Sequence, residues 1–179
     1  MADKKEGTLA ALLEEKRKRG RPRRAISRRN VYVALSPEQK DQMRHLAGML
    51  PAGLNRPDIP DMAANLLATR LELLRRAVAG RNREIPEGIT DLDSLYLLWD
   101  LPLTPDTGDA KWTSIRLSPQ QAIELGRAHG LLNALFGANR SQVFALSLAL
   151  LSQFMQKELV NKRYSSIQEV NDWVARIYL

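Results

Sequence analysis

The chain has 179 residues, 44% of them hydrophobic, which is ordinary for a soluble globular protein with one sizeable domain or two small ones. It holds no cysteine, which excludes disulfides, thiolate nucleophiles and cysteine-based zinc sites. The net charge is +7; residues 1–30 hold 11 Lys and Arg against 4 Asp and Glu, leaving 16 of the 27 basic and 16 of the 20 acidic residues for the rest. Because concentrated positive charge attracts phosphate through counterion release, this distribution predicts a nucleic acid partner.

The basic charge is densest between residues 16 and 24, where Gly20 and Pro22 disfavour a helix and like charges repel. We expect residues 1–27 to form an extended basic arm. Its sequence RGRP looks like the core of an AT-hook, in which glycine lets the backbone approach the minor groove and arginines enter it at A·T tracts. Non-specific phosphate binding is the alternative. The arm residues predicted to contact DNA are Arg19, Gly20, Arg21, Pro22, Arg23 and Arg24.

Two later segments of the chain match each other. Residues 31–37 (VYVALSP) align with residues 113–119 (TSIRLSP), and the same alignment places Gly48 on Gly130. After a short gap, Asn55-Arg56 falls on Asn139-Arg140, and apolar positions continue to coincide at helical spacing. The sequence therefore predicts a duplicated unit, at residues 28–79 and 111–160.

Each unit begins with alternating apolar residues, as a short half-buried strand requires. Ser36-Pro37 and Ser118-Pro119 then combine an N-cap residue with a proline at the first helical position. A helix of about four turns follows, then a polar turn, and then a longer apolar helix that ends near Ala79 in one unit and Leu159 in the other.

Two further helices are expected outside the units. The linker, residues 80–110, is rich in Gly, Pro and Asp but carries an apolar pattern from Leu92 to Trp99 that indicates a short amphipathic helix. In residues 161–179, Ser166 with Glu169 three positions later is a capping-box signature that starts a C-terminal helix. The expected fold class is mostly α with short β-ribbon strands.

The order of strand, Ser-Pro cap, helix, Asn-Arg turn and apolar helix, present twice, resembles the ribbon-helix-helix family of Arc- and MetJ-like DNA-binding proteins. The resemblance implies that strands pair into an antiparallel ribbon lying in the major groove. Two pairings are open: the units pair within one chain, or each pairs with its equivalent in a homo-oligomer.

Period-two alternation directs one face of each strand outward. There Arg116 suits guanine and Asn30 suits adenine, whereas aromatic residues and alanine depart from the polar readers usual in the family. The resemblance also implies a phosphate anchor at the start of each second helix. The second unit should anchor better, because the first has two prolines and two aspartates in residues 55–61. The predicted contacts here are Arg28, Arg29, Asn30, Tyr32, Ala34, Lys111, Trp112, Ser114, Arg116, Asn139, Arg140 and Ser141.

No catalytic set, metal site or cofactor motif is recognised, since His45 and His129 stand without partners at ligand spacing. The longest apolar stretch, residues 143–155, is shorter than the roughly 20 residues of a membrane span. We therefore expect no enzyme and no membrane partner. The expected protein binds double-stranded DNA as a transcriptional regulator in the bacterial cytoplasm, at the nucleoid or on a plasmid.

Two other functions are compatible with the same sequence features. The first is an accessory protein of plasmid transfer or partition, which would use the same ribbon to bend DNA or to assemble a complex. The second is an oligomerisation factor of the antitoxin kind, in which the apolar faces of residues 92–99 or 167–177 capture a protein partner. Salt dependence separates DNA binding from apolar capture, because only the former releases counterions.

Overall fold

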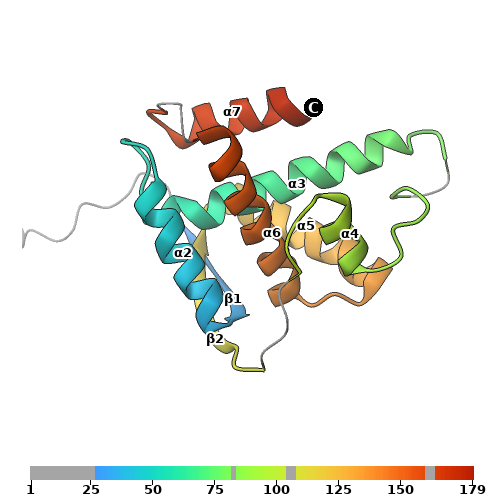
Figure 1. Cartoon of the computed structure of the whole chain (residues 1–179), viewed down its shortest axis with the longest axis horizontal. Coiled ribbons are helices and arrows are strands. Elements are labelled where there is room, and N and C mark those ends of the chain that lie inside the picture. The colour runs from blue at the N-terminus through green and yellow to red at the C-terminus, as the bar shows by residue number, and fades with distance from the viewer. Residues whose placement is uncertain (1–26, 82–83, 104–107, 160–163) are drawn as a thin grey trace, which may run out of the picture.

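The computed structural model describes residues 27–81, 84–103, 108–159 and 164–179 (Figure 1). Its one sheet within these ranges consists of β1, Arg29–Leu35, and β2, Lys111–Leu117. The two strands run antiparallel, with Tyr32 opposite Ser114 at the centre of the register. The strands of the two predicted units therefore pair with each other within one chain.

Each strand is followed by two helices. After β1 come α2, Pro37–Met49, a 3₁₀ turn at Arg56–Asp58 and α3, Ile59–Ala77. After β2 come α5, Pro119–Phe136, and α6, Arg140–Phe154, which continues into a π-helical turn at Met155–Leu159. The linker holds α4, Leu92–Leu98, and the chain ends with α7, Ile167–Tyr178. The fold is mostly helical with a small two-stranded sheet, as the sequence predicted.

The Ser-Pro caps form as expected, but the helices they start differ in length. Ser36 accepts a hydrogen bond from the N–H of Gln39, and Ser118 accepts one from the N–H of Gln121. The expectation of about four turns for both was only approximate, since α2 has 13 residues and α5 has 18. In the first copy Leu50 precedes a proline, which disfavours helical geometry, and its backbone is extended.

The core lies between the ribbon and the helices, and α3 and α6 each supply more of it than any other element. α3 packs against β2, α5, α6 and α7, whereas α6 packs against β1 and α2. Each second helix therefore contacts the strand of the other half, and the two halves share a single core. The largest fully buried side chains of this core include Leu35, Leu46, Leu66, Leu67, Leu117, Leu132, Phe144 and Phe154.

The linker helix and the C-terminal helix pack onto this core. The side-chain amide of Gln153 on α6 donates to the carbonyl oxygens of Trp99 and Asp100, at 2.9 and 3.0 Å, and so ties down the end of α4. On α7, Ser166 caps the helix as predicted, while the Glu169 carboxylate accepts from the N–H and hydroxyl of Ser165. Val170 and Val174 of α7 are buried.

None of the described helices is by itself long and apolar enough to cross a membrane. α5 and α6 together reach that length and composition, but they are bent by 113° at the turn that joins them.

Candidate nucleic-acid interface

The outward face of the ribbon carries three opposed pairs of residues. In an antiparallel ladder, directly opposite residues lie on the same face of the sheet. Five of the six side chains are exposed, with Tyr32 at 60% and Trp112 at 75%, and Ala34 is half-buried. All six positions predicted from the alternation therefore share one accessible surface, which we call the ribbon face. Its pairs are Asn30 with Arg116, Tyr32 with Ser114, and Ala34 with Trp112.

The opposite side of the same strands faces the core. Val33, Leu35, Ile115 and Leu117 are buried there.

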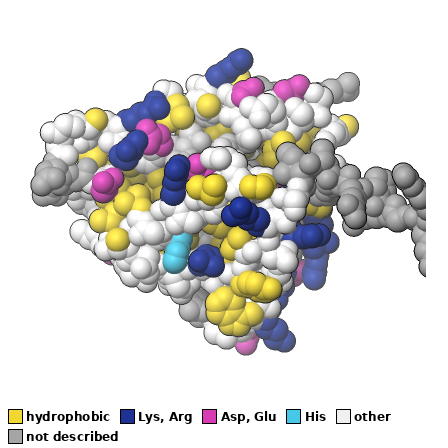
Figure 2. All heavy atoms as spheres, turned by 180° about the vertical axis from the view of Figure 1, so that it is seen from behind, with side chains coloured by type: hydrophobic (Ala, Val, Ile, Leu, Met, Phe, Trp, Pro, Cys, Tyr) yellow, Lys and Arg dark blue, Asp and Glu magenta, His cyan; other side chains and the backbone are white. Residues whose placement is uncertain are grey.

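The outer surface near the strands can be followed in the figures. β1 and β2 lie behind α2 in Figure 1, and Figure 2 shows the molecule from that rear side. Lys and Arg side chains are spread over this side, with hydrophobic side chains between them (Figure 2). The surface around the strands thus offers both charge and apolar contact.

The start of α6 is held against the ribbon. The Ser141 Oγ accepts a 2.8 Å hydrogen bond from the backbone N–H of Ala34. Asn139 and Gln142 form a reciprocal capping box, in which each side chain accepts from the other's backbone N–H at 3.0 and 2.9 Å. Asn139 and Arg140 are exposed. The first N–H groups of a helix have no intrahelical acceptor and carry its positive dipole end, so this position can receive a phosphate.

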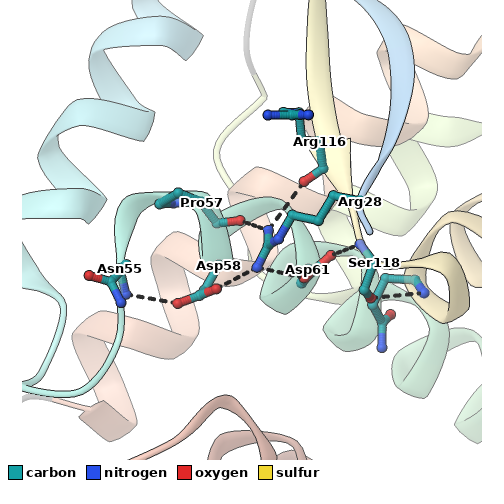
Figure 3. A network of polar contacts seen from close by, with 8 residues as sticks. Arg28, Asn55, Pro57, Asp58, Asp61, Arg116 and Ser118 are labelled. Atoms are coloured by element: carbon teal, nitrogen blue, oxygen red, sulfur yellow. Dashed lines mark hydrogen bonds and ion pairs between the residues drawn. The ribbon is translucent and has the colours of Figure 1, made fainter. Parts of the chain in front are cut away.

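The start of α3 is occupied by a network around Arg28, which Figure 3 shows from close by. The Arg28 Nη2 lies 2.5 Å from Asp58 Oδ1 and 3.2 Å from Asp61 Oδ2. The Arg28 guanidinium also donates to the carbonyl oxygens of Pro57 and Arg116. Its side chain is only 12% exposed. Arg28, predicted as a DNA contact, is thus turned inward to neutralise the two aspartates.

Backbone donors complete the coordination of these two carboxylates. The N–H of Ser118 donates to Asp61 Oδ1 at 2.8 Å, and the N–H of Asn55 donates to Asp58 Oδ2 at 2.8 Å. Burial nevertheless raises the pKa of Asp61 above its ordinary value, because the loss of water outweighs the Ser118 hydrogen bond and the Arg28 charge. The start of α3 therefore presents acidic groups with their own partners, which makes it a poor phosphate anchor.

The remaining predicted residues lie at the starts of the strands or outside the described residues. Arg29 and Lys111 open the two strands, opposite Leu117 and Leu35, and both are exposed. In Figure 3 the Arg116 side chain points away from the network that its own carbonyl oxygen joins. The predicted arm contacts Arg19, Gly20, Arg21, Pro22, Arg23 and Arg24 lie outside the described residues.

Arg116 and the start of α6 both belong to the second unit, but they lie at different ends of the ribbon. Arg116 lies opposite Asn30 at one end of the ribbon. The start of α6 is bonded to Ala34, opposite Trp112, near the other end. Each end of the ribbon therefore combines residues of both units, because antiparallel pairing brings the start of one strand to the end of the other.

Sequence reasoning missed the contact of Arg28 with Asp58 and Asp61. The two aspartates were recognised as unfavourable for phosphate, but their partner lies 30 residues away from Asp58. The available signal was an arginine just before the first strand and two carboxylates at a helix start. Among the described residues, no group of three or more His, Asp or Glu side chains is arranged to hold a metal ion.

No protein-family model, no curated protein and no solved structure matches the chain.

Proposed function

We propose that the chain is a ribbon-helix-helix protein whose two units pair within one polypeptide, and that it binds duplex DNA sequence-selectively as a transcriptional regulator. The observation that carries this proposal is the register of the ribbon. Tyr32 lies opposite Ser114, which is its own counterpart when the two units are aligned. Two copies related by a twofold axis pair a central residue with its own equivalent. The ribbon thus has the pairing expected of a duplicated unit.

The packing of each second helix on the strand of the other half also supports the proposal of two paired units. α3 packs on β2 and α6 packs on β1, so neither half buries its helices alone. A ribbon-helix-helix unit has the same dependence on a second unit. The folded chain consequently presents one complete ribbon without a second chain.

The ribbon face supplies groups suited to base edges. B-DNA's major groove admits a two-stranded ribbon, in which arginine bonds guanine O6 and N7 and asparagine bonds adenine N6 and N7. Arg116 and Asn30 lie opposite each other and are both exposed. Asn139 and Arg140 at the start of α6 are suited to the phosphate backbone beside the groove. The ribbon would then read bases while the helix start fixes its position.

The basic arm completes the proposed mode of binding. The body of the chain is close to neutral, so long-range attraction to DNA falls to residues 1–30. Attraction of this kind accelerates encounter and adds affinity that depends on salt but not on sequence. In the proposal, the arm reaches along the minor groove or backbone while the ribbon supplies selectivity.

Fluorescence anisotropy with labelled duplexes over a series of salt concentrations tests the proposal. The full chain should bind with a log–log slope of about −0.9 per neutralised phosphate. A variant lacking residues 1–26 keeps Arg28 and its aspartate partners, and should bind with a flatter slope. The absence of salt-dependent duplex binding by the full chain would refute the proposal. An accessory protein of plasmid transfer would also show salt-dependent duplex binding. Measurements of DNA bending or of complex assembly would distinguish it from a transcriptional regulator.

One observation favours the second candidate, an antitoxin-like interaction protein. Leu97 and Leu98 of α4 are 69% and 52% exposed, and Leu103 beyond it is 52% exposed. Exposed apolar groups of this kind mark protein contacts. α7 contributes less to such a surface, because Val170 and Val174 are buried. Binding of a protein partner that does not depend on salt, and that is lost in the Leu97→Asp variant, would favour this candidate.

A further inference from the structure

The ribbon face has two ends that differ in chemistry. At one end Asn30 lies opposite Arg116, so hydrogen-bonding groups dominate. At the other end Ala34 lies opposite Trp112, so the surface is apolar. Tyr32 stands between them, opposite Ser114. The pairs lie in one row along the ribbon, because every second residue of a strand points to the same side.

The alignment of the two units shows what this difference means for symmetry. In that alignment, the counterpart of Asn30 is Trp112 and the counterpart of Ala34 is Arg116. A ribbon of two identical units would present the same pair of residues to both halves of its target. Here, positions related by the approximate twofold axis carry an asparagine and a tryptophan, and an alanine and an arginine. The fold keeps the symmetric register, whereas the side chains break the symmetry.

The starts of α3 and α6 also break the symmetry, because they lie at opposite ends of the ribbon and differ in charge. Ser141 at the start of α6 accepts from the N–H of Ala34, so the exposed Asn139 and Arg140 belong to the apolar end. The start of α3 belongs to the polar end, because Arg28 bonds the carbonyl oxygen of Arg116 there. Its carboxylates repel phosphate, whereas the start of α6 attracts it. Base-edge hydrogen bonding and backbone anchoring are thus strongest at opposite ends.

We infer that the chain recognises a non-palindromic DNA site. One half-site supplies guanine and adenine edges to Arg116 and Asn30. The other supplies thymine C5-methyl groups to Ala34 and Trp112, together with the phosphate held at the start of α6. Apolar side chains contact thymine methyl groups in the major groove, which is why this half-site should be rich in thymine. The inference rests on the proposed function, since it names the substrate class of the same face.

The exposure of the aromatic side chains supports this assignment. Trp112 is 75% exposed and Tyr32 is 60% exposed, whereas Trp99 is only 6% exposed. Large exposed aromatic side chains are characteristic of contact surfaces. A surface that also carries Arg116, beside a helix start suited to phosphate, fits a polyanion with apolar groups in its groove. DNA with thymine in the major groove has both properties.

Selection from a pool of duplexes with a randomised central segment tests the inference, using the full chain. The enriched motif should consist of two dissimilar half-sites. Arg116→Ala should reduce discrimination roughly 5- to 150-fold at positions in one half only, the range of a lost base contact. Trp112→Ala should relax only the other half. Leu97→Ala, a matched control for an exposed apolar residue on α4, should leave the motif unchanged.

A symmetrised variant makes the test sharper. The double substitution Ala34→Arg with Trp112→Asn places an arginine opposite an asparagine at both ends of the ribbon. Trp112 is exposed but Ala34 is half-buried, so the folding of this variant is verified by circular dichroism before selection. This variant should enrich an inverted repeat of the polar half-site. An inverted repeat enriched by the unaltered chain, or a motif unaffected by Trp112→Ala, would overturn the inference. No enrichment together with no salt-dependent binding would instead refute the proposed function.

Discussion

The backbone N–H of Ala34 donates a 2.8 Å hydrogen bond to the Ser141 Oγ, and this bond joins the end of β1 to the first turn of α6. It links one half of the chain to the other across 107 residues of sequence. The proposed phosphate anchor and the ribbon face therefore hold a fixed position relative to each other.

Replacing Ser141 should affect both stability and DNA binding. Ser141→Ala removes the acceptor of the Ala34 N–H, which costs about 1 to 3 kcal/mol where a donor is left without a partner. Duplex affinity should fall as well, because the helix start loses its fixed place beside the ribbon. Urea unfolding and anisotropy measure the two effects. Ser141→Thr keeps the hydroxyl and serves as the control; a loss as large as that of alanine would show that the hydrogen bond is not the cause.

Arg28 should matter for stability and not for contact with DNA. Arg28→Ala leaves Asp58 and Asp61 without their cation in a partly buried site, which should cost on the order of 3 kcal/mol in unfolding free energy. The affinity of the folded fraction for duplex should change little. Denaturant unfolding and anisotropy below the unfolding midpoint provide the measurements. If affinity drops while stability is unchanged, Arg28 contacts phosphate after all.

The raised pKa of Asp61 predicts a pH dependence of stability. Because burial raises its folded-state pKa above the unfolded value, protonation favours the folded state. The contribution of Asp61 is thus fully present below the unfolded pKa, near 3.8, and is lost as the pH rises through the folded value. Asp61→Asn keeps an acceptor for the Ser118 N–H without ionising. The wild-type unfolding free energy should decrease relative to this variant across that window; a relative increase would contradict the sign.

Arg70 should stabilise the packing of the linker and the C-terminal helix on α3. Its guanidinium lies 5.6 Å from the centre of the Trp99 ring and 4.4 Å from that of Tyr178. Cation–π contacts of this kind are worth about 0.5 to 2 kcal/mol. Tyr178→Leu should lower the unfolding free energy by about that amount, and Tyr178→Phe should preserve it. Thermal or urea unfolding tests the pair, and equal losses in both variants would assign the effect to the hydroxyl group.

The fluorescence of Trp112 should report on DNA binding. Of the chain's three tryptophans, Trp112 is 75% exposed and Trp99 is 6% exposed. If the ribbon face contacts duplex, acrylamide should quench the emission less after DNA is added, because the exposed indole becomes covered. Trp112→Phe should abolish this protection. Unchanged quenching of the native chain at saturating duplex would place Trp112 outside the interface.

Local features of the fold could be read from the sequence because they depend on residues close together. Alternation in residues 31–35 and 113–117 predicted the outward and inward faces of the strands, although Ala34 on the outward face is half-buried. The Ser-Pro pairs at 36–37 and 118–119, and Ser166, predicted three helix starts correctly. Such patterns reflect the period of a strand and the orphan N–H groups of a helix start, which are fixed within one or two turns of chain.

Only the tertiary structure decided which groups meet across the chain. The pairing of β1 with β2, the inward turn of Arg28 towards Asp58, and the separation of Arg116 from the start of α6 all join distant residues. Strand alternation predicts which face of a strand is buried, but it does not predict which strand will pair with it. A carboxylate at a helix start likewise does not predict which cation will lie beside it. These contacts are selected by the burial of one shared core, whose free energy depends on all the elements together. The sequence alone determined the residues of the ribbon face, and the packing of the two halves determined its two unequal ends.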